Sequence, residues 1–179
     1  MLVTNNKKLF DLCKFYRDQG RNNKSSYIID ELGYKYMPFN LQAALGYSQF
    51  LKIKKIVGLK RSILREYKKC FKKMKDIQFN IDNKIFYNGC WATTIVIGRS
   101  YKIKSSKLMK KLSKRGLPVR PFFMPLSSMK PFNDNLAKKN NTVAYDISSR
   151  GITLPSALNL NKKQIKLYSN NIIDILNEK

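Results

Sequence analysis

The stretch GYKYMPFNLQAALG, from Gly33 to Gly46, carries the clearest local signals in this chain of 179 residues. It closes an irregular connection, residues 21–39, and then places Asn40 where the N-cap of a helix is expected. One face of the predicted helix is lined by Leu41, Ala44, Leu45 and Ser48. Small residues beside them would let another backbone approach this helix closely.

On the N-terminal side, residues 2–4 are predicted to end a short strand. A helix is predicted from about Lys7 to Gln19, with an asparagine cap at position 5 or 6. A single strand followed by a helix cannot bury its faces. We therefore expect residues 1–58 to need a partner, which is either a missing N-terminal segment or another chain.

On the C-terminal side, helical and strand patterns alternate. The predicted helices are residues 49–74, 104–114, 142–149 and a last helix that is capped by Asn161 and ends near Asn177. The predicted strands are residues 77–81, 91–97, 117–123 and 152–154, with Trp91 in the core. This alternation is typical of a small α/β domain, which we place at residues 59–179, after a bend expected at Gly58.

The charge balance is strongly basic, with 36 Lys and Arg against 11 Asp and Glu, a net charge of +25. Such a balance suggests a nucleic-acid partner. The basic residues are spread along the whole chain, however, and the abundance of Lys, Asn and Ile is typical of A+T-rich coding. Two interpretations stand, a nucleic-acid surface and a solvated surface of biased composition, and we favour the second.

Several kinds of chemistry are excluded by residue type. The chain has no histidine, and its three cysteines, Cys13, Cys70 and Cys90, are widely spaced. We therefore expect no zinc site and no histidine-activated nucleophile. No disulfide framework is expected, which favours a reducing cytoplasm. We also expect neither a signal peptide nor a transmembrane helix, because no long apolar run occurs.

Three stretches, in this order and spacing, resemble the DegT/DnrJ/EryC1/StrS family of sugar-nucleotide aminotransferases. The first is GYKYMPFNLQAALG at 33–46, followed by Gln49. The second is RPFFMPLS at 120–127, which is similar to the perosamine-synthase-like members. The third is SSRGITLPS at 148–156. The first five residues also resemble the segment after the family's glycine pair, so the resemblance covers essentially the whole chain.

The resemblance implies an α/β fold, the C-terminal part of a fold type I aminotransferase that uses pyridoxal phosphate (PLP). Residues 1–58 would be the end of the large PLP-binding domain with a linking helix, and residues 59–179 the small C-terminal domain. Family members work as dimers, so a homodimer is expected. They move an amino group from L-glutamate to a keto-deoxysugar of a nucleotide sugar, for O-antigens among other products. The RPFF letters point to GDP-4-keto-6-deoxymannose.

The resemblance also places the family's Schiff-base lysine before Met1. No catalytic residue is therefore assigned in this chain, and the chain alone is expected to be inactive, because PLP chemistry needs that lysine and a carboxylate on the ring nitrogen. One alternative is a catalytically incomplete partner subunit or pseudo-enzyme. A further alternative, ranked last, is a basic nucleic-acid-binding domain.

Five residues are candidates for binding. Lys35 and Tyr36 are expected to contact the cofactor, because the resemblance brings them near the PLP phosphate; the alternatives are an exposed loop lysine and a packing tyrosine. Arg120, Phe122 and Ser148 are expected to contact substrate. The Arg120 fork suits a donor carboxylate or a phosphate, and its alternative is a salt bridge at a strand end. Phe122 and Phe123 are expected to build core or pocket wall rather than to stack on a base. No residue is assigned to a metal.

Overall fold

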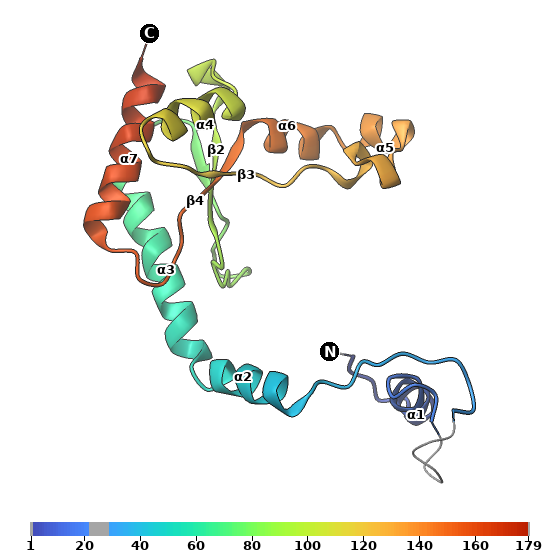
Figure 1. Ribbon diagram of the computed structural model, residues 1–179. Helices are drawn as coiled ribbons and strands as arrows, with labels where there is room; N and C mark the ends of the chain where they lie inside the picture. Colours follow the sequence, from blue (N-terminus) through green and yellow to red (C-terminus); the bar gives the residue numbers. More distant parts are fainter. Residues whose placement is uncertain (1, 22–28, 179) are drawn as a thin grey trace. The chain divides into compact units, whose positions relative to one another are not determined.

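A computed structural model describes residues 2–21 and 29–178 of the chain. They divide into two compact units, with the division between Lys52 and Ile53 (Figure 1). The boundary expected near residue 58 lies inside a continuous helix, α3 (Ile53–Cys70). Gly58 therefore sits in regular helix, and the bend expected there is absent. No helix among the described residues is long and apolar enough to cross a membrane.

The first unit contains two helices, α1 (Lys7–Tyr16) and α2 (Asn40–Phe50). The predicted cap of α1 is confirmed, since the Asn6 side chain accepts a hydrogen bond from the Leu9 amide at 3.1 Å. Asn40, by contrast, is the first residue of α2 and not its cap. Phe39 holds the cap position in an extended conformation, and its amide donates to the Gln42 side chain at 3.0 Å. Residues 2–4 form no strand.

Backbone hydrogen bonds tie the extended segment before α2 to the end of α1. The Tyr34 amide donates to the Tyr16 carbonyl, and the Tyr36 amide donates to the Arg17 carbonyl, both at a distance of 2.8 Å. Gly20 has a φ of 63°, and a Cβ at this position would collide with the Glu31 carbonyl. A residue without a side chain is required at this turn. No residue of α1 or α2 is buried, so the described residues of the first unit are tied by these bonds and by exposed side-chain contacts such as Tyr16 with Glu31 and Lys35 with Asp18.

The second unit is an antiparallel sheet packed against helices. Its further helices are α4 (Ser105–Lys114), α5 (Asn135–Asn140), α6 (Thr142–Arg150) and α7 (Lys162–Asn177). Short 3-10 turns lie at Arg99–Tyr101, Leu126–Ser128 and Lys130–Phe132. The strands are β1 (Ile77–Phe79), β2 (Thr93–Ile97), β3 (Arg120–Pro121) and β4 (Gly151–Leu154), in the spatial order β1-β2-β4-β3.

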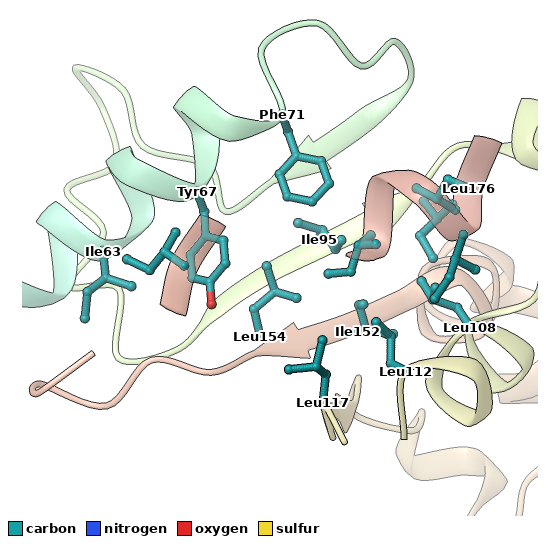
Figure 2. Packing of buried hydrophobic residues seen from close by; sticks show 14 residues of the cluster. Ile63, Tyr67, Phe71, Ile95, Leu108, Leu112, Leu117, Ile152, Leu154 and Leu176 are labelled. Carbon is teal, nitrogen blue, oxygen red and sulfur yellow. The ribbon is translucent and has the colours of Figure 1, made fainter. Parts of the chain in front are cut away.

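The core of the second unit lies between the sheet and three helices. Ile95 of β2 pairs with Ile152 of β4, and both are fully buried on one face of the sheet. Tyr67 and other residues of α3 cover them, together with residues of α4 and α7 (Figure 2). In Figure 1, α7 lies alongside α3. Each fully buried aliphatic side chain contributes about 1.5–3 kcal/mol to folding, so this cluster carries the stability of the unit.

Most predicted elements of the second unit are present, with two departures. The strand predicted at 117–123 is reduced to the two residues of β3, because Pro118 and Pro121 have no amide to donate to a ladder. The predicted helix at 49–74 is interrupted by a turn at residues 51–52, so that α2 and α3 are separate. The cap of the last helix is confirmed, since the Asn161 side chain accepts from the Gln164 amide at 2.9 Å.

Candidate functional site

A cleft of about 750 Å³ opens on the second unit, beside β3 and the turn that follows β4. Residues from four segments line it, among them Lys60, Trp91, Arg120, Phe122, Phe123 and Ser156. The second and third sequence motifs, at 120–127 and 148–156, therefore meet at one place. A cleft of this size can enclose a small-molecule ligand.

The turn after β4 is held rigidly by α3. The Lys60 ammonium donates to the carbonyls of Trp91, at 3.1 Å, and of Ser156. The Tyr67 hydroxyl, whose pKa is raised by burial, donates to the Pro155 carbonyl at 3.1 Å. The Ser156 hydroxyl accepts from the Thr93 amide at 2.8 Å. One wall of the cleft is therefore fixed by hydrogen bonds before any ligand binds.

Arg120 is the cationic side chain of the cleft whose charge is available. It lies on β3 opposite Thr153 of β4, and its side chain is exposed. Within residues 2–21 and 29–178 its guanidinium makes no hydrogen bond or ion pair, so the predicted alternative, a strand-end salt bridge, is not seen there. A guanidinium in this state can take a carboxylate or phosphate in bidentate geometry.

Aromatic side chains form the neighbouring wall. Phe122 is half-buried and meets Phe123 edge-on, with ring centroids 6.4 Å apart. Trp91 was predicted to be in the core, and this is wrong, because 69% of its surface is exposed. Strand β2 begins only at Thr93, and the left-handed Cys90 (φ 52°) turns its own side chain inward instead. The spacing of apolar residues alone did not indicate that Cys90 would be buried and Trp91 exposed.

Ser148 lies on α6 and does not line the cleft. Its hydroxyl donates to the Met124 sulfur at 3.6 Å, and Met124 is a cleft residue. Arg120 and Phe122 therefore both line the cleft, whereas Ser148 contacts the cleft only indirectly, through the Met124 side chain.

Lys35 and Tyr36, the two predicted cofactor contacts, belong to the first unit. The Lys35 ammonium lies 3.2 Å from an Asp18 carboxylate oxygen, and 47% of the lysine side chain is exposed. The Tyr36 ring is exposed and stacks on Tyr34, with centroids 5.4 Å apart and planes 7° apart. Neither residue is packed into a core, so both are accessible from solvent.

The cleft can be compared with what PLP requires, namely a lysine for the covalent link and a carboxylate beside the ring nitrogen. No Asp or Glu of the described residues lines the cleft. Lys60 is its lysine, and that ammonium is already bound to two carbonyls. The cleft therefore fits an anionic substrate but does not fit the reactive ring of the cofactor. No cluster of three potential metal ligands occurs in the described part of the chain.

Comparisons with known proteins identify relatives of the whole chain. The sequence model of the DegT/DnrJ/EryC1/StrS aminotransferase family matches residues 1–172. GDP-perosamine synthase of Escherichia coli O157:H7 is 28% identical over 179 residues, and that of Vibrio cholerae is 29% identical over 178 residues. These alignments cover 100% and 99% of this chain but 48% of each synthase. The chain thus spans about half the length of the curated relatives it matches, their C-terminal half.

A solved structure shows the same fold. Helicobacter pylori PseC, an aminotransferase involved in the biosynthesis of pseudoaminic acid, superposes with a TM-score of 0.81 at 19% sequence identity. The superposition covers 97% of this chain and 47% of PseC. The expected α/β class and the likeness to the C-terminal part of a sugar aminotransferase are confirmed. The chain belongs to the DegT/DnrJ/EryC1/StrS aminotransferase family.

Proposed function

We propose that this chain is the substrate-binding portion of a PLP-dependent aminotransferase that acts on a nucleotide sugar. The whole enzyme would transfer an amino group from L-glutamate to a keto-deoxysugar such as GDP-4-keto-6-deoxymannose. The observation that supports this most is the cleft at Arg120, with an available guanidinium beside an aromatic wall. Family membership supplies the reaction class, and the likeness to GDP-perosamine synthases supports the choice of sugar.

The residues of the cleft would bind and orient. Arg120 would hold an anionic group, either the donor carboxylate or a substrate phosphate, through two parallel hydrogen bonds. Phe122 would exclude water beside it, and Ser148 would support this wall through Met124. Because Lys60 and Tyr67 already hold the opposite turn, the ligand need not order that backbone on binding.

The cofactor would be contacted outside this cleft. When bound, PLP supplies an electron sink for the amino transfer. Lys35 and Tyr36 are proposed to contact its phosphate in the site of a neighbouring subunit, within a homodimer. Lys35 would have to share its charge with Asp18, which lies 3.2 Å away. The lysine that binds PLP covalently is proposed to lie outside these residues, so this chain alone should not carry out the reaction.

The test uses the native protein from its source, with its intact mass measured alongside its activity. We expect the assembly that contains the PLP-binding lysine to aminate GDP-4-keto-6-deoxymannose with glutamate. Changing Arg120→Gln should lower kcat/KM by about 100-fold, since a charged hydrogen-bond partner is lost. Arg65→Gln, on the exposed surface of α3, is the matched control and should change little.

Other outcomes would identify the alternatives. A native chain near 20.9 kDa that binds a full-length aminotransferase without turnover would indicate an incomplete partner subunit. Tight DNA binding that falls steeply with salt, without any binding of nucleotide sugar, would indicate the nucleic-acid reading. Unchanged kcat/KM after Arg120→Gln would remove this cleft from the proposal.

A further inference from the structure

Two large aromatic side chains stand exposed in the Arg120 cleft, where burial would normally be expected. Trp91 is 69% exposed and Phe123 is 70% exposed, and both line the same cavity. Neither packs into the core of the second unit. Exposed aromatic surface inside a cleft is characteristic of a ligand-binding wall, because it contributes to stability only when something covers it.

The geometry of the pair indicates how a ligand would lie. The ring centroids are 6.4 Å apart, and the planes are tilted by 37°. A flat ring needs about 3.5 Å of separation from each neighbour, so there is no room for one to slot between Trp91 and Phe123. The two rings therefore form one continuous wall, and a planar group would stack on its open side.

The charge beside this wall narrows the ligand class. Arg120 lines the same cleft with its guanidinium unpaired among the described residues, and no acidic side chain of those residues lines it. Glutamate could bind the Arg120 guanidinium through a carboxylate, but it has no ring that would cover the aromatic wall. A nucleotide carries both a flat base and a phosphate chain, so it can use the wall and the guanidinium together.

We infer that Trp91 and Phe123 bind the nucleobase of the nucleotide sugar while Arg120 holds its diphosphate. This inference rests on the proposed function and assigns the nucleotide end of the substrate to this cleft. It makes Trp91 and Phe123 substrate-binding residues that set affinity for the base. The Lys60 hydrogen bond to the Trp91 carbonyl at 3.1 Å then acts as a positioning contact for that end of the wall.

The experiment exploits the fact that Trp91 is the single tryptophan of the chain. Tryptophan fluorescence of the full chain is followed during titration with GDP, and in parallel with inorganic pyrophosphate, which has no base. Heat of binding is recorded on the same samples. We expect GDP to quench the fluorescence saturably and to bind about ten-fold more tightly than pyrophosphate, because one stacked base contributes this order of affinity.

Three variants separate the contributions. Trp91→Leu and Phe123→Leu should each weaken GDP binding about ten-fold and leave pyrophosphate binding unchanged, whereas Trp91→Phe should retain most of the affinity. Phe132→Leu is the matched control, since Phe132 is 61% exposed in the same unit but does not line the cleft.

The outcomes distinguish this inference from the proposed function. GDP binding that needs Arg120 but is unaffected by Trp91→Leu and Phe123→Leu, with no quenching, would overturn the inference and leave the proposed function standing. If neither GDP nor pyrophosphate binds in an Arg120-dependent way, both the inference and the assignment of substrate to this cleft fail.

Discussion

The two units of the chain hold themselves together by different means. In the second unit, 14 buried hydrophobic residues close one core between the sheet and helices α3, α4 and α7. In the first, neither α1 nor α2 buries a single residue, although both helices carry apolar side chains. The first unit relies on backbone hydrogen bonds around Gly20 and Tyr34. Apolar spacing along a helix therefore predicts a face that could be buried, but not what buries it.

The uncovered face of the first unit is extensive. Its exposed apolar residues include Leu9, Phe10, Leu12, Leu41, Leu45, Tyr47, Phe50 and Leu51. Soluble proteins rarely leave so many large side chains in water without a partner. We propose that a further segment or another chain covers this face, and we expect the isolated chain to self-associate.

The largest effect should come from a matched pair of leucines, one in each unit. Leu112 of α4 is fully buried, whereas Leu45 of α2 is 65% exposed. Leu112→Ala should lower the free energy of unfolding by about 2–5 kcal/mol, because it leaves a cavity. Leu45→Ala should change it by less than about 0.5 kcal/mol. Urea denaturation of dilute protein measures both, and equal losses would break the comparison between the units.

A smaller effect is expected from a pair of glycines with left-handed backbone. Gly20 in the first unit has a φ of 63° and the Glu31 carbonyl where a Cβ would lie. Gly116 in the second has a φ of 70° and open space there. Gly116→Ala should cost about 1 kcal/mol from backbone strain alone.

Gly20→Ala adds a collision to that strain and should open the turn. The readout is hydrogen exchange at the Tyr34 and Tyr36 amides, which are bonded to the end of α1. We expect faster exchange there in Gly20→Ala and unchanged exchange in the second unit. Protection that survives the substitution would mean that the first unit has support beyond its backbone bonds.

The smallest effect concerns acid stability. Hydrogen bonds from Arg150, and then from Arg99, lower the pKa of Asp146 from 3.8 to about 2. Because the folded pKa lies below the unfolded one, this stabilisation is present above about pH 4 and is lost as pH falls toward about 2. Asp146→Asn should flatten the decline of the urea midpoint over that interval.

Asp18→Asn is the counterpart in the first unit, where the carboxylate lies 3.2 Å from Lys35 and nearly half of each side chain is exposed. An exposed pair of this kind contributes little, so its loss should leave the acid dependence of core unfolding as it was. An effect as large as that of Asp146→Asn would show that the two units unfold as one.

Local chemistry made several elements predictable. Asn6 and Asn161 cap the helices they were expected to cap, since a cap depends on neighbours within three residues. Strands β2 and β4 were found because their apolar residues are bounded by turns. Trp91 was misplaced because the left-handed backbone at Cys90 interrupts the alternation before β2 begins at Thr93. Helix α5 was missed although its cap is local, since the Asp134 side chain accepts from the Leu136 and Ala137 amides. The grouping of Arg120 with Phe122 and Phe123 followed from a motif, whereas Trp91 required the fold.

The hydrogen bond from Lys60 to the Ser156 carbonyl joins two parts of the chain that are synthesised at different times. Lys60 and Ser156 are 96 residues apart. At a synthesis rate of about 5–20 residues per second, Ser156 is added roughly 5–20 s after Lys60. During that interval α3 can exist on the nascent chain, but the cleft wall formed by the turn after β4 cannot. A chain that ends before residue 156 lacks that wall of the cleft, and it also lacks α7 (Lys162–Asn177), whose buried residues close the core of the second unit.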